Sequence, residues 1–116
     1  IRALHFHLRG DGTGEIRSYA SALAEMARAD RDGAAVLVHC AAGTERTGAA
    51  VAFYRLLVQN RPASEAYEEL HRRGWDPSDN PQLLVYMNDH MAELAQRLVE
   101  AGVIDRVPEP LPVLGR

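Results

Sequence analysis

The sequence predicts an α/β fold in which a central, mainly parallel sheet is flanked by helices. Two observations lead to this prediction. An alternating segment at residues 3–8 precedes an amphipathic segment at residues 15–30, and a continuously apolar run at residues 34–39 precedes further helical patterns. Because strands that are apolar on both faces are typical of parallel sheets covered by helices, residues 34–39 are expected to form the central strand.

The first strand and the first helix each have a distinct hydrophobic period. The strand at residues 3–8 alternates apolar and polar side chains, with Leu4, Phe6 and Leu8 set against His5 and His7. Residues 15–30 carry apolar side chains at helical spacing, and the turn-forming sequence DRDG at residues 30–33 ends that helix. The chain therefore begins with a strand, a helix and, at residues 34–39, a second strand.

Three more helices are expected in the second half of the chain. The patterns cover residues 47–60, 62–74 and 80–102, and the last helix has Pro81 at a first helical position and Gly102 as a C-terminal cap. The length predicts a single domain over residues 1–116, in which residues 103–116 form a proline-rich C-terminal tail.

Composition restricts the possible partners and the cellular context. The net charge is −3, and the 13 basic residues form no cluster, which argues against nucleic acid as a partner. The single cysteine excludes an internal disulfide, and no apolar run approaches the ~20 residues that a membrane span needs. We therefore expect a soluble, cytoplasmic protein without a membrane anchor. The oligomeric state stays open.

The chemically informative segment lies between the predicted strand ending at His39 and the predicted helix beginning at Thr47. Its residues are Cys40, Ala41, Ala42, Gly43, Thr44, Glu45 and Arg46. A loop that enters a helix directs backbone N–H groups and the positive end of the helix dipole at one point, which makes an anion site. Arg46 can bind two phosphoryl oxygens through its planar guanidinium, and Gly43 allows a backbone conformation that a Cβ would obstruct.

The same environment would activate Cys40. A thiol at a helix N-terminus and close to a cation has a pKa well below the usual value of about 8.5, so the thiolate becomes a major form at neutral pH. A thiolate in line with a bound phosphoryl group can attack phosphorus and form a phosphocysteine. The alternative is that Cys40 is only a small buried hydrophobic residue.

Residues 39–48 resemble the H-C-x-x-G-x-x-R-[ST]-G signature of the cysteine-dependent protein tyrosine and dual-specificity phosphatase superfamily, and every fixed position matches. The resemblance implies that Cys40 is the nucleophile and that Arg46 binds and stabilises the phosphoryl group. It also implies that His39 tunes the thiolate and that the Thr47 hydroxyl assists when the thiolate leaves.

The resemblance has further consequences for the substrate and for the fold. It implies hydrolysis of phosphorylated protein or small phosphomonoester substrates without metal or any other cofactor. The residues expected to line the phosphate-binding loop are Ala41, Ala42, Gly43, Thr44, Glu45 and Arg46. Members of the superfamily normally have further strands before the point where this chain begins, so the sheet is expected to lack some N-terminal strands.

The superfamily also uses an aspartate, on a loop upstream of the cysteine, to protonate the leaving oxygen. Asp11 is the best match because it follows the first strand and lies among the glycines of the GDGTG sequence. The alternative is a turn in which Asp11 makes only local hydrogen bonds. Asp76 and Asp79 are the reserve candidates.

Three other features of the sequence allow more than one interpretation. His5, His7, His39 and Cys40 could be imagined as a zinc site, although a cation there would compete with Arg46. Trp75 is interpreted as packing a loop against the helices, with lining of the substrate cleft as the alternative. The charges of residues 64–73 are interpreted as a solvated helix face.

Two alternative functions stay open. One is a catalytically weak phosphate-binding module that has kept the loop but lost turnover. The other is a thiol-dependent arsenate reductase or sulfurtransferase-like enzyme, although such enzymes usually have a resolving thiol or a loop of different size.

Overall fold

The computed structural model describes residues 2–5, 12–33, 36–39 and 45–115, and side chains are described in residues 12–33 and 47–115. The elements in chain order are β1 (Arg2–His5), α1 (Ile16–Arg31), β2 (Val36–His39), α2 (Glu45–Phe53), the π-helical turn η1 (Tyr54–Val58), α3 (Ala63–Arg72) and α4 (Pro81–Glu100).

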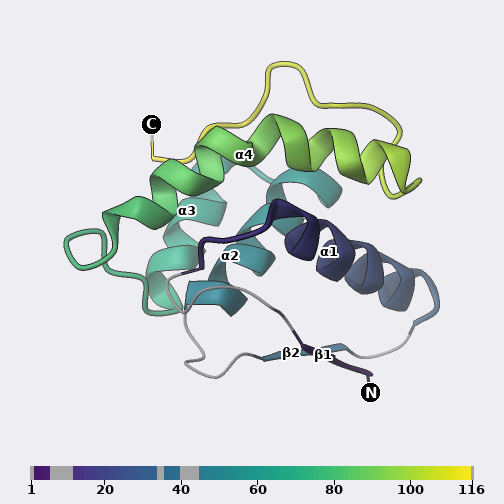
Figure 1. The fold of residues 1–116 in the computed structure, drawn as a ribbon, viewed down its shortest axis with the longest axis horizontal. Coiled ribbons are helices and arrows are strands. Elements are labelled where there is room, and N and C mark those ends of the chain that lie inside the picture. The colour runs from purple at the N-terminus through teal and green to yellow at the C-terminus, as the bar shows by residue number, and fades with distance from the viewer. Residues whose placement is uncertain (1, 6–11, 34–35, 40–44, 116) are drawn as a thin grey trace.

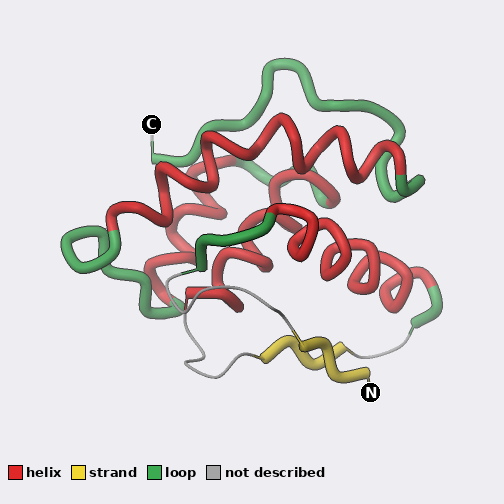
Figure 2. The backbone as a smooth tube through the Cα atoms, in the orientation of Figure 1, coloured by secondary structure: helices red, strands yellow, loops and turns green. Residues whose placement is uncertain are grey.

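The predicted central sheet is wrong. Within the described residues, the β structure consists of the four-residue strands β1 and β2, paired in parallel. Both strands lie at one edge of a mainly helical body, as Figures 1 and 2 show, so β2 is not a central strand. The apolar run at residues 34–39 predicts a strand, and β2 covers residues 36–39 of it, but a hydrophobic pattern does not specify how many strands pair with it.

The described hydrophobic core is formed between helices. In α1 the buried residues recur at helical spacing, and Tyr19 and Leu23 are fully buried. Tyr19 packs edge-to-face on Phe53 at the end of α2, with 5.2 Å between ring centroids. Helix α4 contributes a long buried face that packs against α1: Leu83, Tyr86, Met87, Met91, Leu94, Ala95 and Leu98. Helix-on-helix contacts, and not a central sheet, therefore form most of the described core.

Three of the helix predictions are confirmed within a few residues, namely those for α1, α3 and α4. The helix expected at residues 47–60 differs at both ends. It begins at Glu45 as α2, so Glu45 and Arg46 belong to the helix and not to the loop before it. An acidic residue is favourable in the first turn because of the helix dipole, which gives a physical reason for the earlier start.

At its other end, this helix changes to the wider π-helical turn η1, where the Gln59 N–H donates to the Tyr54 carbonyl at 3.0 Å. Asn60 then adopts a left-handed conformation with φ of 54°. Asparagine tolerates this conformation better than most residues, and a helix commonly ends in this way. The turn directs the chain into α3, which packs against α2.

Residues 101–115 form neither helix nor strand and run back along α4 (Figure 1). Leu114 is buried, and its N–H donates to Asn88 Oδ1 at 2.9 Å while Asn88 Nδ2 donates to the Leu114 carbonyl at 3.1 Å. These paired hydrogen bonds hold the segment against α4. Among the described residues, no helix has both the length and the apolar character needed to cross a membrane.

Candidate active site

Strands β1 and β2 bring two segments of the chain to one edge of the protein. The strands are parallel and His5 pairs with His39, so both strands end at the same edge. The chain leaves β1 toward Gly12 and leaves β2 toward α2, which begins at Glu45. The segments that contain Asp11 and Cys40 therefore start from neighbouring strand ends.

The structure describes some of the sequence-predicted site residues and not others. Cys40, Ala41, Ala42, Gly43, Thr44 and Asp11 lie outside the described residues, and their roles stay predictions. His39 is the last residue of β2, and Glu45 and Arg46 are the first two residues of α2. Thr47, the third residue of α2, is half-buried. The signature thus spans a strand end and a helix start, which is the arrangement that an anion loop requires.

The last signature residue, Gly48, lies where α2 closely approaches α3. A Cβ at Gly48 would lie only 3.1 Å from Leu70 Cδ1 and 3.8 Å from the Cβ of Arg73. A larger residue would force the end of the Leu70 side chain to move by a few tenths of an ångström. Glycine at this position therefore lets α3 support the first turn of α2, the turn that follows the cysteine loop.

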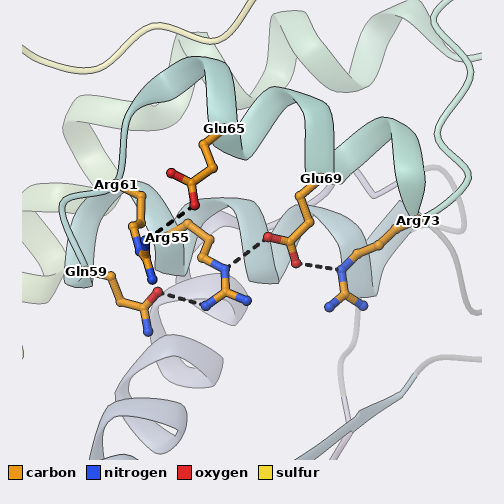
Figure 3. A network of polar contacts seen from close by, with 6 residues as sticks. All are labelled: Arg55, Gln59, Arg61, Glu65, Glu69 and Arg73. Atoms are coloured by element: carbon orange, nitrogen blue, oxygen red, sulfur yellow. Dashed lines mark hydrogen bonds and ion pairs between the residues drawn. The ribbon is translucent and has the colours of Figure 1, made fainter.

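A partly buried ion network joins η1 to α3 and is drawn in Figure 3. Glu69 accepts from Arg55 Nε at 3.0 Å and from Arg73 Nε at 3.1 Å, while Arg55 also donates to Gln59 Oε1 at 2.8 Å. The Glu69 side chain is only 15% exposed, so the interpretation of this segment as a solvated face is wrong for Glu69.

The two arginines also determine the charge state of Glu69. Burial alone would raise the pKa of its carboxyl, but the hydrogen bonds from Arg55 and Arg73 outweigh burial and hold the pKa below its ordinary value of 4.5. Glu69 is therefore ionised at neutral pH. It fixes Arg73 beside the first turn of α2, and it fixes Arg55 at the same time.

Asp76 is poorly suited to be a proton donor. Its Oδ1 accepts from the backbone N–H of Ser78 at 2.9 Å and from the Ser78 hydroxyl at 2.7 Å, and these bonds lower the pKa of the exposed Asp76 carboxyl. A general acid must hold its proton at the working pH, which Asp76 does less readily than an ordinary aspartate. Asp79 is exposed in the same turn.

Trp75 packs inside the described part of the structure. Its side chain is 2% exposed, and Nε1 donates to the Asn80 carbonyl at 2.8 Å. The ring also meets Tyr67 edge-to-face, with 5.7 Å between centroids. The packing interpretation of Trp75 is therefore confirmed, and the indole fixes the turn that carries Asp76 and Asp79.

The candidate zinc ligands His5, His7, His39 and Cys40 lie at or next to the strand ends. His5 and His39 are paired along the backbone, but their side chains, together with His7 and Cys40, lie outside the described set. Elsewhere in the described part of the chain, no group of three or more His, Cys, Asp or Glu residues is placed to hold a metal ion.

Sequence reasoning missed two tyrosines that bind the segment immediately after Asp11. The Tyr19 hydroxyl donates to the Gly12 carbonyl at 2.6 Å, and the Tyr86 hydroxyl donates to the Gly14 carbonyl at 3.0 Å. Tyr19 could be recognised in the sequence only as one apolar position of a helix. Tyr86 lies 72 residues from its partner, a separation that no local pattern reports.

Comparison with known proteins identifies the family of the chain. A family model described as "Tyrosine phosphatase family" matches residues 7–68, more than half of the 116 residues. The chain belongs to this family, which confirms its resemblance to the cysteine-dependent phosphatases. The matched range includes Asp11 and the whole signature but excludes Asp76 and Asp79.

Among curated proteins, the chain is similar to a dual specificity protein phosphatase. TpbA of Pseudomonas aeruginosa strain UCBPP-PA14 is 40% identical over 60 residues, which cover 52% of this chain and 27% of the relative. TpbA of strain PAO1 is 38% identical over 60 residues with the same coverage. The chain thus spans about a quarter of the length of these relatives. No solved structure matches the chain significantly.

Proposed function

We propose that this chain hydrolyses phosphomonoesters as a protein tyrosine or dual-specificity phosphatase, through a phosphocysteine on Cys40. One observation carries the proposal: in a chain of the tyrosine phosphatase family, the complete signature at residues 39–48 runs from the end of β2 into the first turn of α2. That passage is where backbone N–H groups and a helix dipole favour a bound phosphate.

In the first step, the Cys40 thiolate attacks phosphorus in line with the ester oxygen. The S–P bond forms as the P–O bond breaks, and the leaving oxygen takes a proton from Asp11. In the second step, water attacks phosphorus and gives a proton to the Asp11 carboxylate, the S–P bond breaks, and the thiolate leaves with help from the Thr47 hydroxyl. The products are the alcohol or phenol and inorganic phosphate.

Arg46 and the loop bind the group that is transferred. As the second residue of α2, Arg46 belongs to the turn that supplies the positive end of the helix dipole. Its guanidinium is assigned to two of the three equatorial phosphoryl oxygens, and the backbone N–H groups of residues 41–46 are assigned to the same phosphoryl group. His39, at the end of β2, is assigned to the thiolate as the residue that keeps its pKa low.

Asp11 is preferred over the reserve aspartates for two reasons. The segment that contains it leaves β1 beside the strand end that leads to Cys40, because His5 and His39 are paired. Asp76, by contrast, has a lowered pKa and lies outside the residues matched by the family model.

By analogy with the relatives, peptides phosphorylated on tyrosine, serine or threonine are the first substrates to examine. A cytoplasmic location and independence from cofactors stay predictions from the sequence.

The proposed chemistry predicts how activity responds to two kinds of reagent. A metal chelator should leave hydrolysis of an aryl phosphate unchanged, because the mechanism needs a thiolate and an arginine but no metal. Iodoacetate should abolish activity by alkylating Cys40, and inorganic phosphate should slow this inactivation by occupying the loop. Rates of hydrolysis and of inactivation measure both effects. Loss of activity with the chelator, together with resistance to iodoacetate, would contradict the proposal and favour the zinc site.

A further inference from the structure

The hydroxyl groups of two buried tyrosines hold the backbone that follows Asp11. Tyr19 of α1 is fully buried and donates to the Gly12 carbonyl at 2.6 Å. Tyr86 of α4 is 8% exposed and donates to the Gly14 carbonyl at 3.0 Å. The two rings lie close together, with 6.1 Å between centroids. Two helices thus meet at one short segment of backbone, and each supplies one hydrogen bond to it.

The two hydrogen bonds hold a segment of backbone that glycine would otherwise leave free to adopt many conformations. Gly12 and Gly14 have φ of 93° and 135°, in a region that favours glycine. Glycine-rich backbone has many accessible conformations, so an external contact is needed to select one of them. The two tyrosine hydroxyls supply that contact, and the buried Tyr19 hydroxyl would be costly to leave unpaired. Burial, with smaller contributions from the charges of Glu93 and Glu15, raises the pKa of Tyr86 to about 12, so its hydroxyl remains a donor.

The rings that carry these hydroxyls are themselves fixed. Tyr19 packs edge-to-face on Phe53 with 5.2 Å between centroids, and Tyr86 stacks on His90 with 4.3 Å between centroids. A rigid ring places its hydroxyl in a narrow range of positions. The carbonyls of Gly12 and Gly14 are therefore positioned by the helical core and not by the segment alone.

We propose that Tyr19 and Tyr86 are positioning residues for the general acid, acting on Asp11 through the backbone of Gly12 and Gly14. The inference rests on the proposed function, in which Asp11 protonates the leaving oxygen. Gly12 follows Asp11 directly, and consecutive Cα atoms are about 3.8 Å apart, so a shift of the Gly12 carbonyl is passed to Asp11. Misplacement of a catalytic group by about 1 Å can cost a factor of about 100 in rate.

The two tyrosine hydroxyls should differ in how strongly they affect proton donation by Asp11. Tyr19 binds the residue next to Asp11, whereas Tyr86 binds a residue two positions further along the chain. Loss of the Tyr19 hydroxyl should therefore disturb proton donation more than loss of the Tyr86 hydroxyl. Neither tyrosine is assigned contact with the substrate.

The test compares two substrates in each of three variants. A phosphotyrosine peptide has a basic leaving oxygen that needs a proton, whereas p-nitrophenyl phosphate has a leaving group that departs without one. We expect Asp11→Asn to lower kcat/KM, which reports the step in which the leaving oxygen departs, about 100-fold more for the peptide than for p-nitrophenyl phosphate. The same selective loss should be about 10-fold in Tyr19→Phe and smaller in Tyr86→Phe.

Two features keep this test independent of folding. The ratio of the two rates is measured on the same enzyme sample, so a reduced fraction of folded protein cancels. Tyr67→Phe is the matched control, because Tyr67 packs on Trp75 and His71 and supplies neither of the hydrogen bonds to Gly12 and Gly14. Its rate ratio should equal that of the unmodified protein.

The outcomes separate the inference from the proposed function. If Asp11→Asn changes the ratio while Tyr19→Phe and Tyr86→Phe leave it unchanged, the tyrosines do not position the acid and the inference is overturned. If Asp11→Asn leaves the ratio unchanged, Asp11 is not the acid and the inference falls with that assignment. If the unmodified protein hydrolyses neither substrate, the proposed function itself is wrong.

Discussion

Replacing Cys40 with serine is expected to lower kcat for phosphotyrosine and for p-nitrophenyl phosphate by at least about a thousandfold. The reason is that loss of a catalytic nucleophile removes the whole covalent route, and effects of this size are typical of such a loss. A serine hydroxyl also stays protonated in surroundings where a thiol ionises. Steady-state hydrolysis of both substrates, with equal amounts of the two proteins, measures the effect.

The Cys40→Ser variant should still bind phosphate, because the backbone N–H groups, the helix dipole and Arg46 remain. Calorimetric titration with inorganic phosphate checks this, and thermal unfolding checks that the fold is kept. Substantial hydrolysis by Cys40→Ser would show that Cys40 is not the nucleophile. Loss of phosphate binding in a folded variant would show that the thiolate, and not the loop, holds the anion.

Arg46→Lys is expected to lower kcat by a factor of about 100 to 1,000. A lysine keeps the positive charge but cannot donate two parallel hydrogen bonds to the phosphoryl oxygens. Removal of one well-placed donor to transition-state charge costs a factor of this size in other enzymes. The loss should be similar for both substrates because Arg46 is assigned to the phosphoryl group that they share.

Arg61→Lys is the matched control for this prediction. Arg61 lies between η1 and α3, is exposed, and pairs with Glu65 at 3.4 Å on the surface (Figure 3). Surface pairs of this kind contribute little to stability, so its kcat should be unchanged. Near-normal kcat in Arg46→Lys would mean that Arg46 has a structural role at the start of α2.

Local patterns predicted the helices of this fold better than its sheet. Helix α1 and helix α4 each have an apolar stripe at helical spacing, and turn residues or a proline mark their ends. The sheet prediction failed because alternation at residues 3–8 and apolarity at residues 34–39 describe single strands. The number of neighbours of a strand depends on contacts far apart in the chain, and such contacts leave no local signal.

In the candidate site, too, local sequence patterns could be predicted and contacts between distant residues could not. The signature at residues 39–48 is a local pattern, and the passage from β2 to α2 could be predicted from it. The support around it could not: Arg55 meets Glu69 across two helices, and Tyr86 reaches Gly14 across most of the chain. Tertiary packing determines these partners, so only the three-dimensional structure identifies them.

The most direct test of the account is whether a phosphoryl group becomes attached to Cys40 during turnover. Thr47→Ala should slow release of the thiolate in the second step, so that the intermediate accumulates. Rapid mixing of this variant with p-nitrophenyl phosphate is expected to give a burst of about one nitrophenol per active site. Mass spectrometry of the quenched protein should then find the phosphoryl group on the peptide that contains Cys40. A linear release without a burst, with no phosphoryl group on that peptide while turnover continues, would contradict the mechanism.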